Sequence, residues 1–443
     1  MWIRGALSAL LIFSLSISSW AKKEVVFFGG GGEPATPGTI FDKTYEQFAP
    51  FANGSGWTSR SYFNGGHPQS EALAQKILPN QNKPMTTQNI QEEIASLKKR
   101  ILNKNLKSGD QVMLTLATHG LPASDSKKAH QVATSDKQFD LNELKELRDL
   151  AEKNGVQLAI LDFSCHSGSS LALATDKTCV VSGASHNLGY VNAGQYIGKS
   201  LKSGTNLEEA FLSARLKRGA LSPGTPQIST EAGKKAYELT KFLSDSMLEA
   251  TSLTEELDKK GTCEGLSSSP YKKLIAQLRE IQKSPDMYTQ IKIRYEIEKL
   301  SLEPVFKNLE ASMKNYQEKR SGAELAYRAA QRENQKRCVP LGRNQLCGNN
   351  RQWEYGYSDL MFQQKEGKLR GDGIAELNIY KEQVASASFK RWKSLKAQYE
   401  KKVSGIYFTA KEVAKAERDV YQMLYEHFSS QEKKANPCRS FVL

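Results

Sequence analysis

The sequence predicts an α/β protein with a mostly parallel sheet flanked by helices, followed by a mainly α-helical C-terminal domain. In the first half, short apolar runs alternate with segments of helical periodicity, an order typical of a layered fold with a parallel sheet. From about Lys234 onward the strand signals nearly vanish, and long charged segments with helical spacing replace them. These two observations set the fold class.

Short apolar runs bounded by turn residues mark the expected strands, and helical spacing marks the helices between them. One face of the helix expected at 89–105 gathers Ile90, Ile94, Leu97 and Ile101. The strands are expected at residues 25–28, 112–116, 156–163 and 179–183, and the helices at 89–105, 140–153 and 206–215, with a short helix or loop at 42–51.

The second half is expected to form a helical bundle or helical hairpin. Residues 271–337 and 374–431 are long, charged and rich in helix formers. Between them, residues 338–372 are rich in Gly, Asn and aromatic residues and indicate a structured loop. The chain is therefore divided into an α/β domain, residues 22–236, and a helical domain of unassigned role, residues 237–443.

The first residues have the pattern of a secretory signal peptide. Arg4 precedes the almost wholly apolar residues 6–17, and Ser19-Trp20-Ala21 then places small residues at the positions that signal peptidase reads. The apolar run is short for a membrane span, and no later segment is long and apolar enough to cross a bilayer. Residues 1–21 are expected to be removed, which leaves a periplasmic or secreted protein of a Gram-negative bacterium with no transmembrane span.

The composition is that of an ordinary soluble globular protein, with 39% hydrophobic and 25% charged residues. The formal net charge of +14 is spread over both halves of the chain. A diffuse basic excess is weak evidence for nucleic acid, so no nucleic-acid partner is expected. The charge fits equally well a protein that works near an anionic cell envelope or on acidic substrates.

Two loops at the ends of apolar strands carry the candidate catalytic residues. His119-Gly120 follows the strand expected at 112–116, and Cys165 follows the strand expected at 156–163. Reacting groups in open parallel sheets gather at the carboxyl ends of the strands. If the two strands are neighbours, the imidazole and the thiol can face each other.

A cysteine and a histidine in this arrangement suit nucleophilic catalysis. A nearby imidazole activates the thiol and can later protonate a departing amine. The oxyanion of the tetrahedral intermediate needs preorganised N–H donors, and the backbone amides of Gly120 and Cys165 are the candidates. A buried structural role for Cys165, or a disulfide with Cys179 that would silence the site, is the alternative.

The other cysteines are expected to be oxidised in an exported protein. Cys179 lies on an expected strand and is predicted to be a core residue. A Cys338–Cys347 disulfide would close a short loop, and a Cys263–Cys438 disulfide would tie together the ends of the helical half. This pairing is one of three connectivities open to these four residues, and their spacing fits no zinc site.

The ordered set of motifs resembles the caspase-like superfamily of cysteine peptidases, most of all the metacaspases of bacteria and plants. The resemblance rests on a strand that ends in His119-Gly120 and on the later motif Asp162-Phe163-Ser164-Cys165-His166-Ser167-Gly168. It covers roughly residues 24–232, and the C-terminal half shares none. Further segments that resemble the family lie in the same order at residues 139–144, 179–185, 206–211 and 225–229.

The resemblance implies a caspase-like fold of the kind found in metacaspases and legumains. It implies hydrolysis of protein or peptide substrates through a thioester on Cys165, with His119 as acid and base. Calcium activates some metacaspases, but no calcium loop is visible in this sequence. No cofactor is expected to be required, calcium is implied as an activator by the family resemblance alone, and no residue is assigned as a metal ligand.

The chain departs from this family beside the cysteine. An acidic residue commonly stands two positions before the cysteine and selects a basic or polar P1 side chain, whereas Phe163 holds that position here and Asp162 stands three before. Side chains of neighbouring strand residues point to opposite faces. Basic P1 preference then requires a bulge that turns Asp162 inward, or another acid such as Asp125 or Asp136. The candidate substrate contacts are Asp162, Phe163 and Ser185.

These observations predict an exported cysteine endopeptidase whose helical half controls substrate access or binds a protein partner. The first alternative is a catalytically silent protein of the same fold that serves as a binding or scaffold module in the cell envelope. The second is an adhesin-like or envelope-structuring protein whose main role lies in the helical half.

Overall fold

The structure is a computed structural model of the 443-residue chain. The expected signal peptide lies outside the described residues except for Ala21, and so does Cys263. The structure describes residues 21–30, 39–54, 56–63, 68–77, 82–125, 127–185, 193–217, 226–241, 303–341, 344–347, 351–365, 367 and 369–443.

A seven-stranded sheet forms the centre of the first half, with the strand order β10-β9-β8-β4-β1-β2-β3. All neighbouring pairs are parallel except β9 and β10, so the expectation of a mostly parallel sheet is confirmed. The strands are β1 (Lys23–Gly29), β2 (Thr58–Phe63), β3 (Asn82–Lys83), β4 (Gln111–Ala117), β8 (Gln157–Asp162), β9 (Thr178–Ser182) and β10 (Gln227–Ile228).

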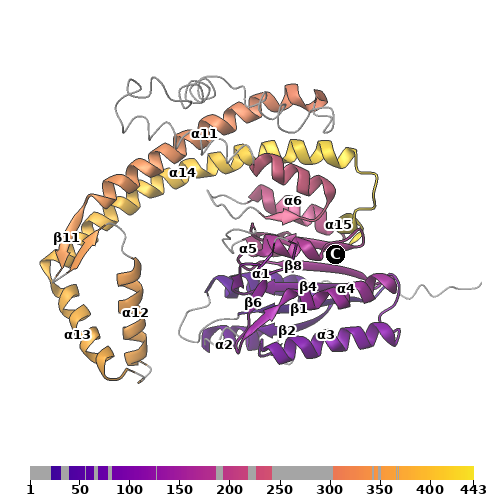
Figure 1. The fold of residues 1–443 in the computed structure, drawn as a ribbon, viewed down its shortest axis with the longest axis horizontal. Coiled ribbons are helices and arrows are strands. Elements are labelled where there is room, and N and C mark those ends of the chain that lie inside the picture. The colour runs from indigo at the N-terminus through magenta and orange to yellow at the C-terminus, as the bar shows by residue number, and fades with distance from the viewer. Residues whose placement is uncertain are drawn as a thin grey trace, which may run out of the picture.

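Helices cover both faces of this sheet (Figure 1). On one face, Val26 and Phe28 of β1 join a core with the aliphatic stripe of α3 (Thr87–Leu102), whose four expected core residues are all buried, and with α4 (Leu144–Lys153). On the other face, Val25 and Phe27 pack with residues of the remaining helices. Those helices are α1 (Thr39–Gly54), α2 (Pro68–Ile77), α5 (Ala193–Ser200) and α6 (Leu207–Lys217).

The order of the strands reverses between β1 and β4. The chain runs outward from β1 through β2 to β3, and then returns to place β4 on the other side of β1. In open α/β sheets, ligands bind beyond the carboxyl ends of the strands at such a switch point. A small antiparallel sheet lies directly after β4 and comprises β5 (Gly120–Leu121), β6 (Gln131–Ala133) and β7 (Gln138–Asp140).

The second half forms a long helical arm (Figure 1). Helices α11 (Glu303–Gln335) and α14 (Ala387–Ser430) lie side by side, with α12 (Arg351–Lys365) and α13 (Asp372–Ala385) at the end far from the sheet. The expectation of a structured loop at residues 338–372 was wrong in part. That segment contains a β-hairpin of β11 (Cys338–Leu341) and β12 (Asn344–Cys347), as well as α12.

The end of the chain returns from the arm to the sheet. After α14 and the short helix α15 (Pro437–Ser440), the backbone N–H of Leu443 donates to the carbonyl of Thr205 (2.8 Å). Phe441 and Leu443 are buried in the same hydrophobic cluster as Phe27 of β1, together with residues from the C-terminal part of α14. The α/β region and the end of the helical region therefore share one core.

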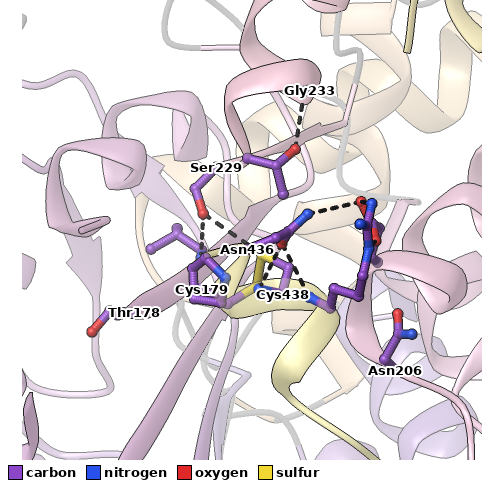
Figure 2. Close-up of a disulfide and its surroundings, with 12 residues drawn as sticks. Thr178, Cys179, Asn206, Ser229, Gly233, Asn436 and Cys438 are labelled. Atoms are coloured by element: carbon purple, nitrogen blue, oxygen red, sulfur yellow. Dashed lines mark hydrogen bonds and ion pairs between the residues drawn. A yellow bond between two sulfur atoms is a disulfide. The ribbon is translucent and has the colours of Figure 1, made fainter. Parts of the chain in front are cut away.

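A disulfide joins this tail to the sheet (Figure 2). Cys179 of β9 is bonded to Cys438 of α15, across a sequence separation of 259 residues. The expected Cys263–Cys438 pairing is therefore wrong, because the returning tail places Cys438 beside β9. Cys179 is buried as expected, but as half of a disulfide. Cys338 is also disulfide-bonded, and Cys347 stands directly opposite it in the hairpin register, in agreement with the pairing expected there.

Polar contacts surround the disulfide and fix the tail in place (Figure 2). The side chain of Asn436 accepts the backbone N–H of Cys438 (3.0 Å) and donates to Glu208 of α6 (2.9 Å). Arg439 pairs with the same Glu208 carboxylate (2.6 Å). The disulfide thus adds a covalent link to a tail that also has polar contacts of its own.

The first prediction concerns this link. Replacing both Cys179 and Cys438 by Ala should lower the free energy of unfolding by about 2–4 kcal/mol, because the unfolded chain gains the freedom that a long-range cross-link removes. Denaturant unfolding followed by circular dichroism measures this. Cys165→Ala, which breaks no disulfide, is the control. If the variant that lacks both Cys179 and Cys438 unfolds at the same denaturant concentration as the parent, the prediction is contradicted.

Candidate functional site

The loops that carry His119 and Cys165 leave neighbouring strands at the same edge of the sheet. Leu116 of β4 stands opposite Asp162 of β8, and the backbone N–H of Phe163 donates to the carbonyl of Leu116 (2.8 Å). His119 follows Leu116 by three residues, and Cys165 follows Asp162 by three. We call residues 118–120 the histidine loop and residues 163–166 the cysteine loop. The condition set by the sequence analysis, that the two strands be neighbours, is therefore met.

The histidine loop lies at the switch point of the sheet. The backbone N–H of Gly30, just after β1, donates to the carbonyl of Ala117 at the end of β4 (3.0 Å). The small sheet then fixes the loop from its other side, since Ala133 of β6 donates its N–H to the carbonyl of His119 (2.9 Å) and accepts the hydroxyl of Thr118 (2.7 Å). His119 is held by its backbone on both sides.

Gly120 brings the two loops into direct contact. A Cβ atom placed on Gly120 would lie 1.9 Å from the carbonyl oxygen of Cys165, so any larger residue requires the backbone to move. The approach is possible because glycine has no side chain. The two proposed oxyanion donors, the N–H groups of Gly120 and Cys165, therefore belong to loops in contact, and both hydrogen-bond to the thiol of Cys165.

The two candidate catalytic groups have shifted pKa values of opposite sign. Burial raises the pKa of the half-buried Cys165 thiol, and the hydrogen bonds from the backbone amides of Gly120 and Cys165 offset this only in part. Burial lowers the pKa of His119, whose ring packs edge-on against Phe41 of α1 with centroids 4.9 Å apart. Both shifts favour the neutral thiol and the neutral imidazole at neutral pH.

Cys165 forms no disulfide, so the silencing Cys165–Cys179 pairing is wrong.

The residue after the cysteine has unusual backbone geometry. His166 has φ 61° and ψ 11°, a left-handed conformation that non-glycine residues seldom adopt. It connects β8 to the 3-10 helix η2 (Ser167–Leu173), so Cys165 stands on a sharp turn between a strand and a helix. Such conformations cost about 1–3 kcal/mol and cluster at functional sites. The strain supports a functional role for the turn that presents Cys165.

Asp162 lies beneath this turn and is fully buried. Its Oδ1 accepts hydrogen bonds from the backbone N–H of Ser164 (3.0 Å) and from the Ser164 hydroxyl (2.5 Å). Its Oδ2 contacts His130 Nε2 (2.7 Å) and accepts the Ser170 hydroxyl (2.5 Å). Burial alone would raise the pKa of Asp162, but His130 and the two serines outweigh it and lower this pKa. Asp162 is therefore a buried carboxylate whose two oxygens are both satisfied by the protein.

The other two candidate substrate contacts are also enclosed. Phe163 is fully buried on the opposite face of the sheet from Asp162, in the core that contains Phe48, and the two ring centroids are 5.6 Å apart. Ser185 is 5% exposed, in a loop that Ala184 ties to the Ser167 hydroxyl (3.0 Å). The expected substrate contacts at Asp162, Phe163 and Ser185 are thus all buried in this structure.

The alternative acids for a basic P1 pocket have local partners of their own. Asp136 accepts the backbone N–H of Thr87 (2.8 Å) at the start of α3, which holds the pKa of Asp136 below its usual range. Asp125 accepts the backbone N–H of Lys127 (2.9 Å). Both carboxylates therefore accept hydrogen bonds from the nearby backbone, and neither needs a bound substrate as its partner.

Sequence reasoning missed His130. This residue immediately precedes β6, and both its side chain and that of its partner Asp162 have no exposed surface. Nothing in the local sequence Lys128-Ala129-His130 marks it, because its partner lies 32 residues away and is brought close only by the pairing of strands. Its place beside both loops makes it part of the site.

No protein-family model matches this chain, and no curated protein matches it significantly. Within the described residues, no cluster of His, Cys, Asp and Glu side chains is placed to hold a metal ion. None of the described helices is long and apolar enough to cross a membrane. The fold and the site define an α/β protein with a mostly parallel sheet, a histidine and a cysteine on adjacent strand ends, and a helical C-terminal region.

The second prediction concerns the contact between the loops. Gly120→Ala should lower the free energy of unfolding by about 1–3 kcal/mol, because its Cβ atom cannot fit against the carbonyl of Cys165 without backbone movement. Chemical denaturation measures this. The matched control is Gly322→Ala in α11, where a Cβ atom meets nothing within 4 Å and which should be neutral or stabilising. Equal effects of the two substitutions would rule out the tight contact.

Proposed function

We propose that the chain is an exported, caspase-like cysteine endopeptidase that hydrolyses peptide bonds with Cys165 as nucleophile and His119 as acid and base. The observation that carries this proposal is the contact between Gly120 and Cys165 at the carboxyl ends of two neighbouring parallel strands. His119 directly precedes Gly120, so this contact supports the proposal by bringing together the two loops that carry the proposed base, nucleophile and backbone donors.

The pKa shifts favour a neutral resting pair in this mechanism. Neutral His119 accepts the proton of the Cys165 thiol as the sulfur attacks the peptide carbonyl, and a C–S bond forms while the carbonyl oxygen becomes an oxyanion. When the C–N bond breaks, His119 gives this proton to the departing amine. Water, activated by the same imidazole, then hydrolyses the thioester and regenerates the thiol.

The backbone amides of Gly120 and Cys165 are proposed to stabilise the oxyanion. In the resting site hydrogen bonds from both amides lower the pKa of the thiol. During the proposed attack the substrate oxygen replaces the sulfur as the acceptor of these two amides. One donor of this kind typically contributes about 3 kcal/mol to lowering the barrier. The proposal includes no metal ion or other cofactor.

The substrate is proposed to be a protein or peptide, with no P1 preference assigned. The buried and fully hydrogen-bonded Asp162 supplies no acidic pocket, and Phe163 belongs to the core. Export to the periplasm or beyond is supported by the Cys179–Cys438 disulfide, because disulfides persist in oxidising compartments.

A second candidate function is binding through the arm, as a silent scaffold protein of the same fold. The observation in its favour is the apolar surface at the distal end of the arm. Met361 of α12 and Ile374 and Ile379 of α13 are 38%, 49% and 54% exposed. Turnover by the parent chain distinguishes the two functions.

The third prediction tests the nucleophile. The mature chain should cleave members of a mixed peptide library under mild reductant, and Cys165→Ala should reduce cleavage by at least about a thousandfold, because the thioester cannot form. Mass spectrometry of the products measures this and reports P1. Cys338→Ser, which removes a disulfide-bonded cysteine of the arm hairpin and no residue of the candidate site, is the control. Equal cleavage by the parent and by Cys165→Ala would exclude the proposed nucleophile.

The fourth prediction concerns pH. Since protonated His119 cannot accept the thiol proton, kcat/KM should rise with pH as His119 loses its proton. Burial lowers the pKa of His119, so the midpoint of this rise should lie below the ordinary histidine value of 6.5. Initial rates on a cleaved peptide measure the profile, with melting temperatures at each pH as the control for unfolding. A midpoint above 6.5 in the folded protein would contradict a buried, neutral His119.

A further inference from the structure

We propose that His130 is a positioning residue that fixes the histidine loop against the cysteine loop and compensates the negative charge of Asp162 beneath Cys165. This inference rests on the proposed function of the site and adds a residue to it. His130 was not identified by any motif, and the mechanism above does not use it.

His130 acts on the cysteine loop through Asp162. The His130 Nε2 atom is 2.7 Å from Asp162 Oδ2, and Oδ1 of the same carboxylate accepts the backbone N–H of Ser164 (3.0 Å). Ser164 directly precedes Cys165, and its hydroxyl also lies 3.3 Å from His130 Nε2. The orientation of the carboxylate therefore fixes the peptide that leads into Cys165.

His130 also touches the histidine loop. A Cβ atom placed on Gly120 would lie 2.9 Å from Cε1 of His130, so the ring packs against this glycine. The segment of His130 continues into β6, where Val132 pairs with Gly120 and Ala133 donates to the carbonyl of His119. One side chain thus contacts both loops that carry the proposed oxyanion donors.

The contact between His130 and Asp162 also has an electrostatic role, because both groups can carry charge close to the Cys165 thiol. The titratable group that contacts His130 is Asp162 from β8, and Ser164 and Ser170, which also contact this carboxylate, are neutral. The Asp162 carboxylate raises the pKa of the Cys165 thiol. Burial lowers the pKa of His130, but the attraction of Asp162 outweighs burial and raises it. Where His130 is protonated, its charge lies against the Asp162 carboxylate and opposes the effect of that carboxylate on the thiol.

The experiment measures the reactivity of Cys165 without requiring peptide hydrolysis. The full chain, with its disulfides formed, is alkylated with iodoacetamide from pH 6 to 10, and the Cys165 peptide is quantified by mass spectrometry. His130→Gln keeps a donor for Asp162 but removes the positive charge, so alkylation at pH 7.5 should be about tenfold slower and its pH midpoint higher. Asp162→Asn removes the negative charge and should shift the midpoint in the opposite direction.

A purely structural role for His130 would not produce opposite shifts. His427→Gln in α14 is the matched control and should leave the midpoint unchanged. In the same preparations, His130→Gln should lower kcat for a cleaved peptide with little change in KM. If His130→Gln does not fold, as judged by circular dichroism, Asp162→Asn alone tests the charge effect through the direction of its shift.

The outcomes separate the two proposals. Opposite shifts of the midpoint support the role of His130, even if the parent chain hydrolyses no peptide and the proposed function fails. Peptide hydrolysis by the parent with no shift in either folded variant, or with shifts of the same sign, overturns the role of His130 and leaves the proposed function intact.

Discussion

The close approach of Gly120 to Cys165 is the constraint on which the candidate site depends. It requires that β4 and β8 be neighbours in a parallel register that brings Leu116 opposite Asp162, so that both loops leave the sheet together. It also requires a residue without a Cβ atom on the histidine loop, since the carbonyl of Cys165 occupies that space. The buried pair of His130 and Asp162 and the left-handed turn at His166 then set how the thiol is presented.

The helical half belongs to the architecture of the site domain through its last residues. The tail buries Phe441 and Leu443 in the sheet's own core, and a disulfide holds Cys438 to β9, the strand next to β8. The arm formed by α11 and α14 is thereby fixed at one end, while α12 and α13 lie at its other end, beyond the β11–β12 hairpin (Figure 1). The last part of the arm thus shares the core of the sheet, while two smaller apolar clusters lie farther along it, one around Trp392 and one around Leu377.

Local patterns were enough for the elements with continuous apolar character, such as β4, β8 and the face of α3. They were not enough for β2, because Arg60 interrupts that strand and is compensated by Glu24 and Glu93 from distant segments. The candidate catalytic residues, His119 and Cys165, were identified because each follows the end of an expected strand. The partner of Cys438 and the role of His130 depend on contacts between distant residues, which no local pattern records.

The central claim is that Cys165 forms a thioester with a peptide carbonyl. The most direct measurement is to quench the mature chain with acid during incubation with peptides and to map acylated residues by mass spectrometry. The account predicts an acyl group on Cys165 that hydroxylamine removes and that Cys165→Ala lacks. Peptide turnover by folded protein with no acylated Cys165, or with the acyl group on another residue, would contradict it.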